Sequence, residues 1–110
     1  MDNVEVRFEL TLKSLEPEFG AGIDLQAILF LIGVQELGKG AKNFNKREKL
    51  EVLHIAVCRL LSEYSYYEFE GYDQDGWPHY KRTEKLPFLN PSEQELLMKE
   101  AVVNYFEKLN

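Results

Sequence analysis

The N-terminal segment alternates strictly between apolar and polar side chains. Over residues 4–13, every second position is apolar: Val4, Val6, Phe8, Leu10 and Leu12. A period of two is typical of a half-buried β-strand, so we predict a strand here. A helix with Phe8, Leu12 and Leu15 on one face is the alternative, and it would turn Val6 and Leu10 away from that face. Glu16-Pro17 is expected to end either element, because the residue before proline avoids the α region.

Two segments in the middle of the chain predict helices. Leu25–Leu37 is apolar nearly all round, with Asp24 placed to cap its start and Gly38 to cap its end. We expect this helix to be central and buried. The second helix follows Asn45, whose spacing to Glu48 resembles a capping box.

The second helix carries one clear apolar face at helical spacing. Its members are Leu50, Leu53, Val57, Leu60, Leu61 and Tyr64. Val52 and Ile55 fall on the other side, near Arg59 and Ser62. We expect Val52 and Ile55 to meet either a second layer of the fold or a second subunit.

A β-hairpin is predicted around Asp73-Gln74-Asp75-Gly76, which has the composition of a turn. Residues 66–71 and 77–83 would form its two strands. A four-residue loop would place three cross-strand pairs opposite one another: Phe69 and Tyr80, Glu68 and Lys81, and Tyr72 and Trp77. Aromatic and opposite-charge pairs of this kind stabilise an antiparallel ladder.

The C-terminal segment predicts another helix, with Asn90 as its cap, Pro91 at its first position and Glu93 in its first turn. The elements together predict a mainly helical α+β fold, in which three helices pack with a β-hairpin and a possible N-terminal strand. In the alternative, the N-terminal segment is a fourth helix. The length of 110 residues is typical of one domain, so we expect residues 1–110 to form a single domain.

Charge and cysteine content restrict the setting of the protein. Nineteen acidic and thirteen basic residues give a net charge of −6, which disfavours nucleic acid and anionic membranes as partners. The single cysteine, Cys58, cannot form an internal disulfide and fits a reducing compartment. The N-terminus lacks the pattern of a signal peptide, and no apolar run reaches the ~20 residues of a membrane span. We therefore expect a soluble, cytoplasmic protein.

No motif for catalysis or for cofactor binding is complete. His54 and Cys58 are four residues apart on the predicted helix, so they are neighbours that could form a nucleophile–base pair or half of a metal site. A buried structural thiol is the interpretation we favour, because no third group is assigned. The stretch from Gly33 to Lys39 has the letters of a phosphate loop, but Gly40 stands where Ser or Thr is needed. We expect no cofactor and no metal, and the sequence favours a binding module over an enzyme.

Basic residues gather in one short region of this acidic chain: Lys39, Lys42, Lys46, Arg47 and Lys49. Several of them lie in the first turn of the second helix, where cations oppose the helix dipole. Free N–H groups at that end, together with cations, suit a phosphate or a carboxylate. A site for a small anionic ligand at Lys39, Lys42, Lys46 and Arg47 is therefore the alternative function.

Seven of the fourteen aromatic residues lie between Tyr64 and Tyr80. In the predicted register Tyr66, Tyr72, Trp77 and His79 share one face of the hairpin. A two-stranded ribbon buries only one face against its own helices, and exposed Tyr and Trp are typical of partner surfaces. We therefore predict a protein–protein interaction or regulatory module that forms a homodimer or binds another protein. Its interface would be this face, together with Val52 and Ile55.

Overall fold

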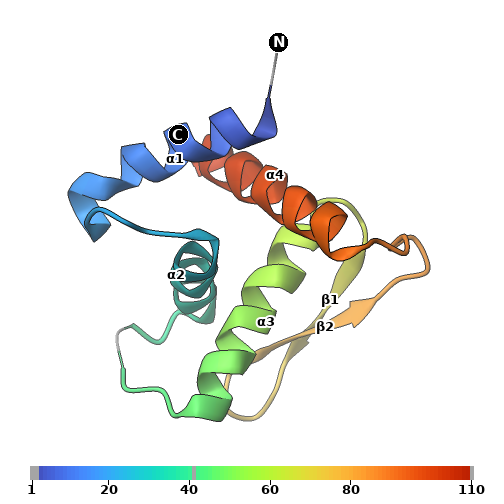
Figure 1. Cartoon of the computed structure of the whole chain (residues 1–110). Coiled ribbons are helices and arrows are strands. Elements are labelled where there is room, and N and C mark those ends of the chain that lie inside the picture. The colour runs from blue at the N-terminus through green and yellow to red at the C-terminus, as the bar shows by residue number, and fades with distance from the viewer. Residues whose placement is uncertain (1–2, 41, 110) are drawn as a thin grey trace.

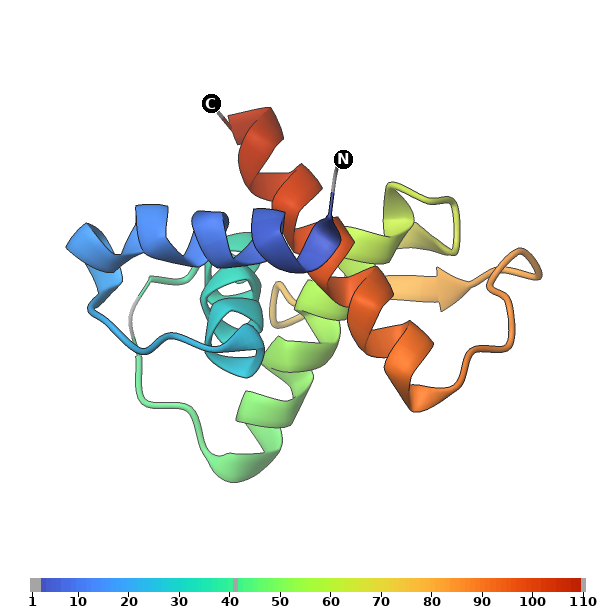
Figure 2. The same cartoon turned by 45° about the horizontal axis from the view of Figure 1, so that its top comes forward.

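A computed structural model describes residues 3–40 and 42–109. It is a mainly helical α+β fold with the element order α1 (Val4–Phe19), α2 (Leu25–Leu37), α3 (Lys46–Ser62), β1 (Tyr67–Tyr72), β2 (Pro78–Arg82) and α4 (Pro91–Leu109). Helix α3 is central: α2 packs on one of its sides and the hairpin on another, while α1 crosses α4 (Figure 1). In the view of Figure 2, α1 runs across the molecule and the C-terminal end of α4 rises above it.

The N-terminal segment is a helix, so the predicted strand is wrong and the fourth-helix alternative is right. The Asn3 side chain accepts a hydrogen bond from Glu5 N and caps α1. Phe8 and Leu12 are buried, whereas Leu10 is 62% exposed. Only a helical period separates Leu10 from Leu12 in this way, because in a strand both would lie on one face.

The expected break at Glu16-Pro17 is also wrong. Helix α1 continues through Pro17 to Phe19 and ends at Gly20, whose N–H donates to the Glu16 carbonyl at 2.8 Å. Pro17 lies in the last turn of α1. Its missing N–H removes one backbone hydrogen bond near the end of the helix, so the rest of the helix is not interrupted. Gly20 has a φ of 89°, which a residue with a side chain rarely adopts.

The other three helices begin where their caps predict. Asp24 accepts from Ala27 N, and Gly38 ends α2 in the left-handed conformation. Asn45 and Glu48 form a complete capping box at the start of α3. Asn90 and Glu93 exchange the same pair of bonds before α4, at 2.8 and 3.0 Å.

The apolar interior forms two adjoining clusters. The larger one joins all four helices, and its fully buried members include Ile28, Ile32, Leu60 and Val102. The smaller one lies between α2, α3 and the hairpin turn, and consists of Leu37, Phe44, Val52 and Ile55, with Trp77 packed against it. The smaller cluster fixes the position of the hairpin relative to α3.

The face of α3 that packs inward is wider than the predicted one, and Leu60 and Leu61 are buried as predicted. Val52 and Ile55 are buried, whereas Leu50 is exposed. Helix α2 and the hairpin pack on two sides of α3. Positions outside the single predicted apolar stripe, such as Val52 and Ile55, are therefore buried as well. Val52 and Ile55 thus meet a second layer of the same chain, and their side chains are not available to a partner.

Candidate functional site

The hairpin turn is held by Asp73. Its Oδ1 accepts hydrogen bonds from the N–H groups of Asp75 and Trp77, each at 2.9 Å. Its Oδ2 accepts from His79 Nε2, also at 2.9 Å. The bond from His79 and those from the two backbone groups hold the pKa of Asp73 below its usual value. The turn is therefore a rigid base from which the two strands extend.

The register of the hairpin follows the prediction only as far as Phe69. Phe69 pairs with Tyr80 and Glu68 with Lys81, as expected. A bulge between Phe69 and Gly71 then places Tyr72 opposite Pro78, so the predicted pairing of Tyr72 with Trp77 is wrong. One extra residue in β1 changes which side chains share a face beyond that point.

The four hairpin residues predicted to share a face are separated. Tyr66 stacks on Tyr64, with ring centroids 5.6 Å apart. Trp77 packs edge-on against Phe44 at 6.3 Å, inside the smaller cluster. His79 is bonded to Asp73. Among the three Tyr and Trp residues of that set, Tyr72 alone is largely exposed.

Tyr72 instead joins a group of side chains that we call the hairpin patch: Phe69, Tyr72 and Tyr80. The Phe69 ring lies 5.2 Å from that of Tyr72 and 5.5 Å from that of Tyr80, in edge-to-face contacts. Phe69 is 51% exposed and Tyr72 is 67% exposed, while Tyr80 is half-buried. Phe69 is not among the residues that the sequence predicted for the interface; Gly71 inside the strand was the signal of the bulge that brings Tyr72 beside it.

A groove of 570 Å³ separates the hairpin turn from the first half of α3. Both histidines of the chain line it, His54 from α3 and His79 from β2. Three of its acidic side chains are already engaged: Glu48 in the capping box, Glu51 with Arg47 at 3.3 Å and Asp73 in the turn. Each of these contacts lies within α3 or within the hairpin, so they fix the two sides of the groove separately.

The basic residues from Lys39 to Arg47 do not converge on one point. Lys39 donates to the Asp75 carbonyl and lies over the Trp77 ring, so it ties the loop after α2 to the hairpin turn. Lys42 lies 3.7 Å from Glu48, and Arg47 pairs with Glu51. Lys46 is exposed. The Glu48 N–H in the first turn of α3 already donates to Asn45, so the anion-binding site stays a prediction that this geometry does not favour.

The Cys58 thiol is fully buried, and its Sγ lies 3.4 Å from His54 Nε2. Burial raises the pKa of Cys58 to about 11, so the thiol keeps its proton at neutral pH. A nucleophilic cysteine needs a lowered pKa and access to a substrate. This thiol has neither property, and its surroundings are those of a core side chain.

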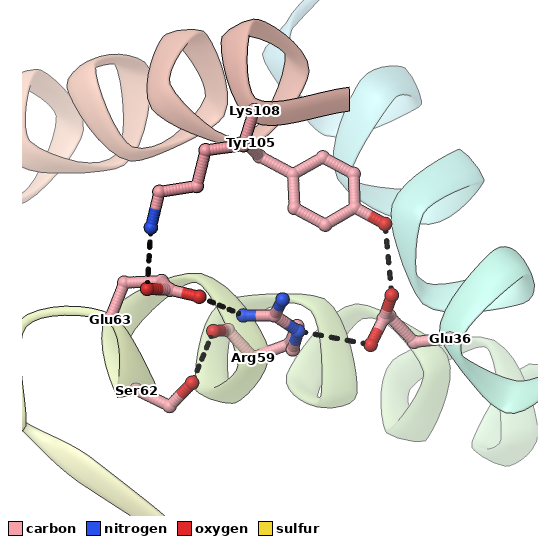
Figure 3. Close-up of polar contacts among 6 residues, drawn as sticks. All are labelled: Glu36, Arg59, Ser62, Glu63, Tyr105 and Lys108. Carbon is pink, nitrogen blue, oxygen red and sulfur yellow. Dashed lines mark hydrogen bonds and ion pairs between the residues drawn. The ribbon is translucent and has the colours of Figure 1, made fainter. Parts of the chain in front are cut away.

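A polar network joins α2, α3 and α4 at the far end of α3 (Figure 3). Arg59 donates to Glu36 at 3.1 Å and to Glu63 at 2.8 Å. From α4, Lys108 donates to Glu63 and the Tyr105 hydroxyl to Glu36. Burial and the bond to Glu36 raise the pKa of Tyr105 to about 12. The charged groups drawn in Figure 3 all have partners, so we assign the network a structural role.

Within residues 3–40 and 42–109, no three side chains of the kinds that bind metals gather into a site. None of the helices in that part of the chain is long and apolar enough to cross a membrane. Comparison with known proteins gave no match, whether to a family model, to a curated protein or to a solved structure. The function is therefore inferred from the residues and geometry of the chain itself.

Proposed function

We propose that this chain is a small, single-domain protein–protein interaction module of the cytoplasm whose contact surface is the hairpin patch. The main support is that Phe69 and Tyr72 expose half or more of their surface while their rings pack against each other. Adjacent exposed aromatic rings favour protein contacts, because they offer a large area and lose little conformational freedom on binding. The lone buried thiol fits the reducing cytoplasm.

A second copy of the chain is the partner that the hairpin favours. Strand β1 carries Glu68 and Glu70, whereas β2 carries Lys81 and Arg82. Two hairpins packed face to face about a two-fold axis parallel to the strands lay β1 of each copy over β2 of the other. The Phe69 and Tyr72 rings of one copy then meet those of its partner, while Glu68 and Lys81 point to the opposite face of their strands. Burial of these rings has to offset the repulsion between two chains of charge −6.

The chain offers a matched control in Phe88. This side chain is 99% exposed in the loop before α4, and no ring contact joins it to the hairpin patch. A single exposed apolar side chain is ordinary on protein surfaces, whereas a contiguous aromatic pair is not. Replacing Phe88 therefore removes the same kind of exposed surface without touching the proposed interface.

The test compares the solution mass of the wild-type chain, the double variant Phe69→Ser/Tyr72→Ser and the control Phe88→Ser by sedimentation equilibrium. Interface aromatics contribute ~2 kcal/mol or more, so the double variant should raise the dimer dissociation constant at least about 30-fold. Phe88→Ser should leave it unchanged. Circular dichroism checks that all three chains are folded. A wild-type chain that stays monomeric at millimolar concentration, or a double variant that dimerises as well as wild type, would refute self-association through this patch.

A further inference from the structure

An open groove of 810 Å³ lies between two pairs of helices. Helix α1 packs chiefly on α4, and α2 packs chiefly on α3. In Figure 2 the start of α2 and the first half of α4 lie on either side below α1. All four helices contribute apolar side chains to the groove: Phe8, Leu12, Leu29, Leu53 and Met98. Its size is within the range of natural binding pockets, and it is separate from the hairpin patch.

The banks of this groove are polar and acidic. Glu9 lies on the α1 side, Asp24 at the start of α2 and Glu95 on α4. Among the described residues that line the groove, Lys99 is the one cation, and its Nζ donates to Glu5 at 2.8 Å. That bond and the nearby charges of Glu95 and Glu9 raise the pKa of Lys99. Lys99 is thus fully compensated, and the banks as a whole carry negative charge.

We propose that this groove binds the apolar face of an amphipathic helix from a partner protein, with lysine or arginine residues flanking that face. An apolar floor between two polar banks matches the way a helix seats in a groove, with apolar side chains at i, i+3, i+4 and i+7 pointing down. The flanking cations of such a helix lie over Glu9 on one bank and Glu95 on the other. This inference does not depend on the hairpin patch.

The same banks disfavour other occupants. A fatty acid would bring its carboxylate to the acidic rim, where Lys99 is already paired with Glu5. A second copy of this chain carries a net charge of −6, which the acidic rim repels. Charge complementarity therefore selects a basic partner over an anionic amphiphile and over self-association at this groove.

The test uses a fluorescent peptide of about 18 residues made only of Leu and Lys, with the leucines on one helical face. A peptide of the same composition, with the leucines spread around the helix, serves as its control. Binding to the full chain is measured by fluorescence anisotropy, and the site is located by amide chemical shifts. We expect the amphipathic peptide to bind at least about tenfold more tightly than its control, since only it can fill the apolar floor. We also expect shifts at residues 25–29 and 91–99.

Two double variants separate this groove from general attraction to an acidic protein. Glu9→Lys/Glu95→Lys reverses both banks, while Glu18→Lys/Glu70→Lys makes the same change in net charge at exposed sites away from the groove. The first pair should weaken binding roughly tenfold, and the second by less than about twofold, because exposed charges act over short range in salt. Met98→Gln on the floor should also weaken binding, with circular dichroism as a check on folding.

Three results would overturn the proposal. One is equal binding of the two peptides, and another is an equal effect of the two charge reversals. The third is a set of shifts confined to residues 69–80, which would move the peptide to the hairpin. Dodecanoate is tested as well: if it binds in the groove and the amphipathic peptide does not, the occupant is an acyl chain and a partner helix is excluded.

Discussion

Gly33 of α2 lies directly against Val52 of α3. A side chain at Gly33 would overlap the Val52 carbonyl oxygen, and its Cβ would come 2.7 Å from Val52 Cγ1. Helices α2 and α3 approach this closely because α2 has no side chain at that point. The glycine that begins the phosphate-loop-like stretch in the sequence is thus a packing residue.

The variant Gly33→Ala should be destabilised. The added methyl group forces α2 away from α3, which costs roughly 1–3 kcal/mol and outweighs the ~1 kcal/mol that alanine gains in an exposed helix. Urea unfolding measures the free energy of unfolding. Gln35→Ala, at an exposed position of the same helix, should change it by less than about 0.5 kcal/mol. A Gly33→Ala chain as stable as wild type would contradict the close packing.

Leu10 and Leu12 should respond differently to the same substitution. Leu12→Ala removes a buried side chain from the contact of α1 with the core and should cost about 2–4 kcal/mol. Leu10→Ala removes an exposed one and should cost less than about 0.5 kcal/mol. In a strand the two side chains would share a face and lose similar amounts. Equal losses in urea unfolding would therefore favour the strand over α1.

Arg59 should matter more than Arg47, although each pairs with a glutamate four residues further on. Arg59 also bonds to Glu36 and lies over the Tyr105 ring, so it joins three helices. We expect Arg59→Ala to lower the free energy of unfolding by about 1–2 kcal/mol, and Arg47→Ala by less than about 0.5 kcal/mol. Thermal and urea unfolding of both variants measure the difference, and similar losses would show that the network adds nothing to an ordinary surface pair.

Trp77 should act as a core residue. Its ring packs on the cluster around Phe44, so Trp77→Ala should lower the free energy of unfolding by about 3 kcal/mol. Phe88→Ala, at an exposed position, should be neutral. Neither variant should change the solution mass, which sedimentation equilibrium measures. If Trp77→Ala turned a dimer into a folded monomer, the interface would include Trp77 as the sequence predicted.

Cys58 should react with a thiol reagent far more slowly than a free cysteine. Its pKa of about 11 against an ordinary value of 9.0 leaves the thiolate about 100-fold rarer near pH 8, and burial slows access further. Denaturant should restore the rate of an unprotected thiol. The sign of the pH effect follows from the same shift: the raised pKa contributes stability below pH 9, which is lost as the pH rises toward 11. Rapid labelling of the folded chain at neutral pH would revive the Cys58–His54 pair.

The elements predicted correctly are those whose ends depend on local chemistry. Asp24, Asn45 and Asn90 each bond to a backbone N–H three residues further on, and the sequence shows such caps directly. The N-terminal segment is ambiguous by comparison. When every second residue is apolar, every fourth residue is apolar as well, which is also the spacing of one helix face. Phe8 and Leu12 therefore satisfy both a strand and a helix. The segment forms a helix that packs its apolar face on α4, a partner about ninety residues further along the chain.

The candidate sites were less predictable because they depend on register and on distant segments. The bulge at Gly71 moves Tyr72 next to Phe69, and only the glycine within the strand signals it. The groove between the helix pairs is built from four separate helices, and no local pattern shows which of their faces stay uncovered. Sequence reasoning found the right hairpin but the wrong set of exposed rings.

The pairing of α1 with α4 has a consequence for how the chain is made. Arg7 binds Glu107 and Glu5 binds Lys99, so α1 finds its partners about ninety or more positions later in synthesis. At ordinary translation rates, the ribosome needs on the order of ten seconds to cover that distance. During that interval Phe8 and Leu12 have no apolar surface of α4 to cover them. The apolar face of α1 thus stays without its partner until α4 has been synthesised.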